Sequence, residues 1–469
     1  MEKLKIVFVV IFLSCLSVQG QSSWDLEQCI VYAKNHNIGL KQINLNNQTM
    51  LNNAEQSKLG LLPSLNAAAT HQYNFGQTID RYTNSFVKSQ AVLSQNFYLS
   101  SSVMLWSGMS QYNNIKASEY NYLSGVERLK QQENDLSLGV ANAYIGVIFS
   151  EEILKISHNQ YQITKEQLER TQKLVIAGSL AKSEEYNILA QLASEEVNVT
   201  AAENGYNMSI LNLKQLMNFD SVTTFNIARP DLNVQESLLL ENNLTNIYET
   251  ALKNQPSIKS SEYSILSAEK YLMASKGRVS PSLSFNASMG TGTSGLAKKV
   301  IGYQDQTQML YTNMGAFSYT VQSPVLANTP FAEQFKNNAN KSIGFTFSMP
   351  LYNGFQTSTA IKNAKINSLN ARFSMDLAKQ NLYKSIAQAY GNARAALNKY
   401  KASSASVKAA NESFFYAQQK FNAGVISSYD FNSAKAKVFT AECNMLQDKY
   451  DYIFKLKVID YYLGKPLSL

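Results

Sequence analysis

The sequence predicts a mixed α/β protein made by internal duplication, in which each half combines short strands with a long helical hairpin. Landmark glycines recur at one spacing: Gly108 and Gly354 are 246 residues apart, and so are Gly178 and Gly424. A repeat at a fixed offset over this length indicates duplication rather than chance periodicity.

The absence of proline predicts that both hairpins are long helices. Proline breaks helix interiors because it lacks an N–H and its ring clashes with the preceding turn, and none of the eight prolines lies within 64–229 or 351–465. Gly108 to Ala177 is 70 residues, which is about 105 Å of helix and predicts a coiled-coil or tubular array. An apolar stripe at helical spacing comprises Val140, Ala143, Tyr144, Val147 and Ile148.

Residues 1–20 are predicted to be a secretory signal, with two lysines, an apolar run and a small-residue cleavage site before Gln21. A lipoprotein signal ending at Cys15 is the alternative, and it fits less well because the apolar core would be short. No later apolar run approaches the ~20 residues of a membrane-spanning helix. If this exported protein enters a membrane, it is therefore expected to do so as a β-barrel.

Other classes of protein receive little support. Cys29 and Cys443 remain after cleavage and indicate no disulfide framework. The net charge of +8 is spread along the chain, without the basic blocks of a nucleic-acid-binding protein.

A second offset, of 218 residues, relates the segments before the long helices. Trp24 to Leu62 is predicted to be helical and has a later copy that begins at Leu244. Each helix should end before a proline, Pro63 or Pro281, because the preceding residue is pushed to extended geometry. Strands then follow, and apolar residues alternate with polar ones, as they do in barrel strands and in soluble sheets with one solvent-exposed face. Apolar positions of the four predicted strands are Leu65, Ala67 and Ala69; Phe97, Leu99, Val103 and Leu105; Leu283, Phe285 and Ala287; and Ile343, Phe345 and Phe347.

The two offsets differ by 28 residues, so the second half carries an insertion within 290–342. This polar stretch is predicted to be a long loop. Residues 219–243, around Arg229 and Pro230, are predicted to be a linker between the halves with little regular structure.

No catalytic constellation is found. His36, His71 and His158 lack the spacing of metal ligands. A GxGxxG pattern begins at Gly290, but no βαβ unit surrounds it, so it does not indicate a dinucleotide site. The sequence predicts no enzyme activity, no cofactor and no metal site.

Four stretches resemble the TolC-like outer-membrane efflux protein family. They are the helix break 251–258, the strand entry 281–283, the helix entry 351–354 and the hairpin tip 420–431. The similarity spans essentially the whole mature chain. Ile38 departs from the pattern because it stands where the second half has the helix-break proline.

The resemblance implies a homotrimer, and so do the strands, because four strands leave two open edges that lipid cannot satisfy. Three copies would close a 12-stranded outer-membrane β-barrel continuous with a periplasmic α-helical barrel. The expected organisation is a signal at 1–20, a first repeat at 21–218, a linker at 219–243, and a second repeat at 244–469 whose loop 290–342 is extracellular.

The function implied by the resemblance is a passive duct for small toxic compounds, served by an inner-membrane transporter and a periplasmic adaptor. Protein export by a single-step secretion system is the alternative within this architecture. An exported structural coiled-coil protein is the alternative of another class, and it does not explain the alternating strands.

The resemblance also assigns site residues at the hairpin tips. Asp430 and Glu184, each six residues after its tip glycine, are expected to form an acidic constriction, although an acid in the first turn of a helix is common for dipole reasons alone. The resemblance also implies polar contacts that hold such a constriction closed, but here Phe421 lacks the expected hydroxyl, Ile426 replaces a basic residue and Ser433 replaces a second acid, so a weaker closed state is expected. The expected adaptor-docking residues, for which a plain helix-hairpin turn is the simpler interpretation, are Ala177, Gly178, Ser179, Leu180, Ala423, Gly424, Val425 and Ile426.

Overall fold

The computed structural model describes residues 23–88, 91–220, 225–230 and 243–467, so the predicted signal and most of the predicted linker lie outside the described residues. The described chain forms two compact units. One unit contains the strands and comprises Leu51–Tyr120 and Leu266–Leu369; the other contains the hairpin tips and takes its described residues from 23–50, Asn121–Ile265 and Asn370–Leu469. Each unit therefore takes segments from both predicted repeats.

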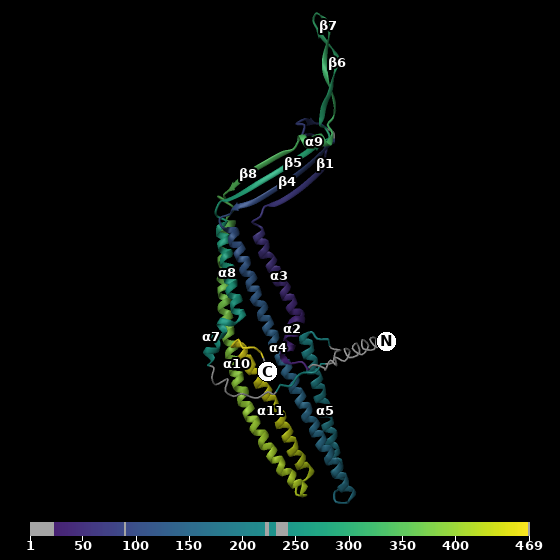
Figure 1. Cartoon of the computed structure of the whole chain (residues 1–469), viewed down its shortest axis with the longest axis vertical. Helices are drawn as coiled ribbons and strands as arrows, with labels where there is room; N and C mark the ends of the chain where they lie inside the picture. The colour runs from purple at the N-terminus through teal and green to yellow at the C-terminus, as the bar shows by residue number, and fades with distance from the viewer. Residues whose placement is uncertain (1–22, 89–90, 221–224, 231–242, 468–469) are drawn as a thin grey trace, which may run out of the picture. The chain divides into compact units, whose positions relative to one another are not determined.

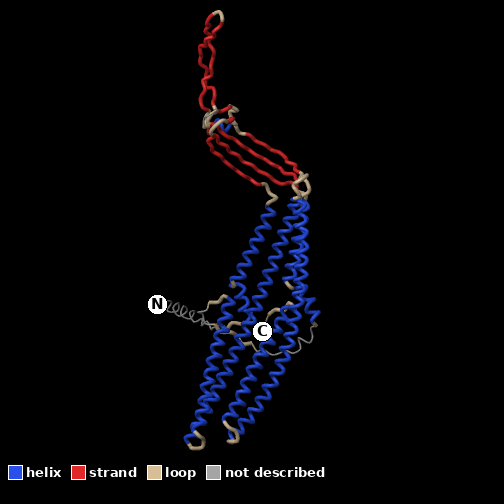
Figure 2. Tube along the Cα trace, turned by 180° about the vertical axis from the view of Figure 1, so that it is seen from behind, coloured by secondary structure: helices blue, strands red, loops and turns tan. Residues whose placement is uncertain are grey.

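The same order of elements occurs twice: two helices, two strands of one sheet, and a pair of long helices (Figures 1 and 2). The long helices α4 and α10 each contain 67 residues, which corresponds to about 100 Å. The first set is α2 (Leu26–His36), α3 (Ile38–Leu59), β1 (Ser64–Asn74), β4 (Val92–Trp106), α4 (Ser110–Ile176) and α5 (Lys182–Met217). The second set is α7 (Leu244–Asn254), α8 (Pro256–Gly277), β5 (Ser282–Ser294), β8 (Asn340–Ser348), α10 (Gln356–Asn422) and α11 (Ser428–Tyr462).

The four predicted strands form one antiparallel sheet in the order β1-β4-β5-β8. The register confirms that the apolar positions share one face: Leu65 pairs with Ser101, which pairs with Ala287, which pairs with Ile343. The opposite face is polar, as in the row Asn66, Ser100, Ser288 and Ser342. Strands β1 and β8 each have an unpaired edge within the described chain.

The predicted alternation in β4 is wrong at its end. A bulge between Met104 and Trp106 leaves Leu105 out of the register, and Trp106 pairs with Leu283. An inserted residue reverses the parity of the residues after it, so Trp106 takes the place on the apolar face that alternation assigned to Leu105.

The segment from Trp24 to Leu62, which was predicted to be helical, forms two helices, α2 and α3. The chain breaks at Asn37, with φ −61° and ψ 122°, as it does at Gln255 before the proline of the second half. The Asn37 side chain replaces the proline as the cause, because its Oδ1 accepts from Leu40 N at 3.1 Å and its Nδ2 donates to Leu216 O at 3.3 Å. Capping of this kind begins a new helix without proline.

Residues 290–342 are not the predicted long loop. They complete β5 and form an antiparallel hairpin of β6 (Lys298–Thr312) and β7 (Gly315–Asn328), followed by the short helix α9 (Phe331–Asn337). The hairpin is exposed on both faces, so neither face needs a run of apolar residues and the period-two pattern is weak. A second small hairpin, β2 (Thr78–Ile79) and β3 (Phe86–Val87), lies between β1 and β4.

The helical unit has two hydrophobic clusters. The first contains Tyr144 and Met217 of the first half, and the second contains Ile247 and Ile386 of the second half. Helix α11 contributes to both, through Tyr450 and Ile453 to the first cluster and through Tyr452, Leu456 and Ile459 to the second. The return helix of the second half therefore joins the two halves of this unit.

The described part of the linker is more ordered than predicted. Ile227 forms a parallel bridge with Trp24, and the Tyr144 hydroxyl donates to Ala228 O at 2.6 Å. Among the described residues, α4 alone has an apolar stretch long enough to cross a membrane by length and composition, contrary to the sequence-based expectation, and 39% of that stretch is buried. Helix α4 supplies Val140, Tyr144, Val147 and Ile148 to the first hydrophobic cluster, so its apolar residues have packing partners within the unit.

Candidate functional site at the hairpin tips

The two hairpins reverse with the same backbone geometry. Gly178 has φ 76° and Gly424 has φ 74°, the left-handed region that glycine adopts without steric cost. Ser179 N donates to Leu174 O at 2.9 Å and Val425 N donates to Lys420 O at 2.9 Å. These bonds satisfy carbonyls at the ends of α4 and α10 in the manner of a Schellman motif, so turn chemistry alone explains the two glycines.

A hollow of about 660 Å³ lies between the two tips. It is lined from the first hairpin by Ser179, Leu180 and Glu184 and from the second by Gly424 and Ile426, so these predicted site residues are brought together. The predicted residues that do not line it are Ala177, Gly178, Ala423, Val425 and Asp430. Val425 is 71% exposed at the turn.

The two predicted constriction acids differ in their surroundings. Asp430 is exposed in the first turn of α11, where its N donates to the Ser427 hydroxyl at 3.2 Å and that hydroxyl donates to Asp430 Oδ2 at 2.8 Å. Glu184 occupies the matching turn of α5 and faces the hollow. Its Oε2 is buried and has no hydrogen-bond partner among the residues that the structure describes. Capping therefore explains the position of Asp430 but leaves Glu184 unsatisfied.

One of the positions that depart from the family pattern, Phe421, has an aromatic partner. Phe421 stacks on Phe431 with ring centroids 4.7 Å apart, so this position packs where the family pattern would have a hydroxyl. A different polar link joins the hairpins near the tips, where Arg170 Nη1 donates to Asn422 Oδ1 at 2.8 Å.

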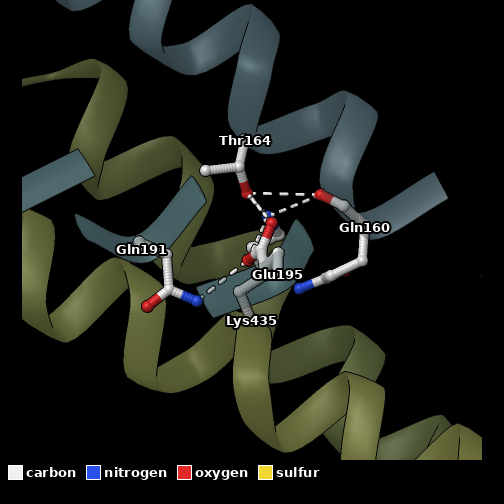
Figure 3. A network of polar contacts seen from close by, with 5 residues as sticks. All are labelled: Gln160, Thr164, Gln191, Glu195 and Lys435. Carbon is white, nitrogen blue, oxygen red and sulfur yellow. Dashed lines mark hydrogen bonds and ion pairs between the residues drawn. The ribbon is translucent and has the colours of Figure 1, made fainter. Parts of the chain in front are cut away.

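Away from the tip turns, a buried ion pair joins three helices (Figure 3). Lys435 of α11 lies 3.3 Å from Glu195 Oε1 of α5 and donates to Gln160 O of α4 at 3.1 Å. Thr164 of α4 accepts from Lys435 and donates to Glu195, and Gln191 Nε2 donates to Glu195 Oε1 at 2.9 Å. The side chains of Lys435 and Glu195 are only 3% and 4% exposed.

Burial lowers the pKa of Lys435, and the negative charge of Glu195 opposes that shift. Removing either partner would leave a buried charge without compensation, which is costly. This network holds the return helix of the second half against the first hairpin.

This network was not predicted from the sequence, although the repeat contains a signal for it. At the 246-residue offset, Lys435 corresponds to Leu189 and Glu195 corresponds to Ala441. A charge in one copy where the other has an apolar residue marks a position whose surroundings differ between the halves.

Known proteins share both the sequence pattern and the fold. The family described as "Outer membrane efflux protein" matches residues 247–465. The outer membrane protein TolC of Salmonella enteritidis is 21% identical over 99% of this chain and 86% of its own length. The alkaline protease secretion protein AprF of Pseudomonas aeruginosa is 18% identical over 72% of this chain and 63% of its own length. The structure of CusC, which forms a transmembrane channel, superposes with a TM-score of 0.74 at 14% identity over 96% of both chains. These matches agree with the strand–hairpin order of the structure, and the chain is similar to TolC-like outer membrane efflux proteins along nearly its whole length.

Proposed function

We propose that this protein is the outer-membrane channel component of a tripartite efflux system, a passive exit duct for small toxic compounds. The observation that carries the proposal is the four-stranded sheet, which has an apolar face, a polar face and two unpaired edges, and whose strands lead into long helical hairpins. The sheet lies in the outer membrane and the hairpins extend into the periplasm.

A trimer resolves the unpaired edges. Unpaired backbone N–H and C=O groups are too costly in lipid, so β1 of one copy pairs with β8 of the next and three copies close a ring of twelve strands. The row with Leu65 and Ile343 then faces lipid, and the row with Asn66 and Ser342 faces a polar lumen. This assignment follows the apolar-out, polar-in rule of membrane barrels.

The partners are a periplasmic adaptor at the hairpin tips and an inner-membrane transporter that the adaptor joins to the channel. The hollow between the tips supports this assignment because it combines apolar residues with a buried carboxylate oxygen, Glu184 Oε2, that has no partner among the described residues. Replacing Ser179 or Val425 by Trp should abolish efflux without reducing the trimer in the membrane, whereas Ala405→Trp on the exposed surface of α10 is the control. Loss of the trimer in the tip variants would instead mean that these residues serve folding.

The constriction is formed by Asp430 and Glu184 of three copies. Threefold symmetry brings like charges together, and such a ring attracts cations. Ser427 hydrogen-bonds Asp430, whereas Glu184 Oε2 has no partner among the described residues, so both carboxylates should be replaced when the constriction is tested.

Export of proteins is the second candidate function, and the similarity to a protease secretion protein favours it. Deleting the gene and measuring both sensitivity to detergents, dyes and metals and the secreted proteome separates the two. Sensitivity with an unchanged secreted proteome supports efflux, whereas loss of a secreted protein without sensitivity supports secretion. No change in either would favour a structural coiled-coil protein.

A further inference from the structure

The apolar face of the sheet is not uniform, because the short helix α9 covers part of it. The rings of Phe331 and Phe335 pack against Phe97 with centroids 6.1 and 5.5 Å away. Thr291, which pairs with Phe97 across β4 and β5, donates from its hydroxyl to Phe335 O at 2.6 Å. Phe97 is in the apolar rows, so α9 lies on the apolar face.

Helix α9 is held firmly in this place. Gln334 is 7% exposed, and its Oε1 accepts from Ser294 N at 2.8 Å while its Nε2 donates to Ser294 O at 3.1 Å and Thr329 O at 2.9 Å. Asn338 Nδ2 donates to Gly292 O at 2.7 Å. Anchoring on both sides of Phe335 means that the space beside it is preformed.

A shallow hollow of about 500 Å³ lies between α9 and the sheet. Three consecutive alanines, Ala67, Ala68 and Ala69, line it together with Met289, Phe335 and Ala339, and none of the described residues that line it is charged. Ala67 and Ala69 lie on the apolar face and leave the space open, because larger side chains at these positions would fill it. Its size is within the range of small-molecule pockets, which is about 300–1,000 Å³.

Two lysines are neighbours of residues that line the hollow. Lys341 pairs with Met289, a lining residue, and Lys336 follows Phe335 on α9. Both are exposed and neither forms an ion pair among the described residues, whereas the nearby Glu333 is engaged by Lys299 at 2.5 Å. An apolar hollow with free cations at its rim matches an acyl chain that carries an anionic head group.

We infer that the hollow binds an acyl chain of lipid A, the phosphorylated glycolipid of the outer leaflet, with a phosphate near Lys336 and Lys341. The inference rests on the proposed function for its orientation. Strand β8 runs from Asn340 to Ser348 and continues into the periplasmic helix α10, so its Asn340 end is the outer end. The hollow and both lysines therefore lie at the depth of the outer leaflet.

The test is native mass spectrometry of the full-length protein, extracted in mild detergent and exchanged into nanodiscs that contain phosphatidylcholine with either lipid A or phosphatidylglycerol. Wild type should retain lipid A and little phosphatidylglycerol. The double variant Lys336→Glu/Lys341→Glu should retain at least about tenfold less, since each basic residue near an anionic surface contributes about fivefold in affinity. The charge-matched control Lys365→Glu/Lys408→Glu, on exposed positions of α10, should retain lipid A as wild type does.

A second pair of variants tests the acyl chain rather than the charge. Ala67→Phe fills the hollow and should reduce retention, whereas Ala287→Phe, on the same face but outside the hollow, should not. Equal retention in all variants, no retention by wild type, or equal retention of phosphatidylglycerol would each overturn the inference. If a conducting trimer forms without retained lipid, only this inference fails; if no trimer forms, the proposed function fails with it.

Discussion

The buried pair of Lys435 and Glu195 predicts a large and asymmetric response to mutation. The two side chains are 3% and 4% exposed and lie 3.3 Å apart, so removal of one partner leaves the other charge buried. Such a loss costs about 3–5 kcal/mol, whereas replacing both partners by apolar residues is often neutral. The repeat supplies the replacements, because Leu189 and Ala441 occupy the corresponding positions. Lys435→Leu and Glu195→Ala should each be destabilising, and the double variant should recover most of the loss.

Hydrogen exchange measured by mass spectrometry reports this loss locally. In either single variant, amides of α5 and α11 around the pair should exchange about 150- to 5,000-fold faster, up to the limit set by global unfolding. Peptides of α7, which packs in the second hydrophobic cluster, are the internal control. The coupling of the two charges would be refuted if the single variants exchange like wild type. It would also be refuted if exchange in the double variant is accelerated by as much as the two single effects combined.

The pH dependence has a definite sign. Burial lowers the pKa of Lys435 below its ordinary 10.5, so the unfolded state holds this proton more tightly than the folded state. Stability contributed by this group therefore rises with pH between the lowered pKa and 10.5. The defect of Glu195→Ala should shrink in alkaline buffer after correction for intrinsic exchange, and a defect that grows would contradict the burial of a charged lysine.

Three further predictions concern other parts of the chain. Tyr144→Phe removes hydroxyl bonds to Trp24 O at 3.0 Å and Ala228 O at 2.6 Å and should lower the free energy of unfolding by about 1–3 kcal/mol, measured by guanidinium unfolding of the helices. Burial raises the pKa of Tyr144, so the wild type should lose stability as pH rises above 10, and the variant should lose less. An equal loss in both would show that Tyr144 does not contribute to the alkaline loss of stability. Ile343→Arg, on the proposed lipid face, should cost about 2–4 kcal/mol if it lies near the bilayer midplane, and Ser342→Arg, on the proposed lumen face, should cost far less, measured as trimer recovered from membranes. Asp430→Ala and Glu184→Ala should weaken cation preference and block by multivalent cations in planar bilayers, and unchanged selectivity in both would remove these acids from the gate.

The long helices and the sheet could be predicted because their signals are local. The proline-free stretches predicted where the helical hairpins begin and end. Alternation along each strand predicted which residues share the apolar face, and the strand register confirmed it. The sharpness of the helix break at Asn37 could not be predicted, because a side-chain cap there replaces the proline of the second half. The bulge at Leu105 and the exposed hairpin of β6 and β7 were missed because neither leaves a clear period in the sequence.

The site was less predictable because its residues meet across the fold. The glycine turns identified both tips. The sequence does not show that Glu184 faces the hollow and Asp430 does not, because that difference arises from how the hairpins pack. The pair of Lys435 and Glu195 comes from different halves of the chain. A sequence read along one helix at a time shows two ordinary surface charges there, and only the packing of α11 against α5 makes them a buried pair.

Closure of one barrel by three copies, through their unpaired strand edges, is the central claim for this protein. Cryo-electron microscopy of the particle extracted from outer membranes in detergent tests it most directly. We predict a threefold particle in which β1 of each copy pairs with β8 of the next, and twelve strands enclose a lumen lined by the row with Asn66 and Ser342. A particle with unpaired β1 and β8 edges, or a lumen lined by the row with Leu65 and Ile343, would contradict it.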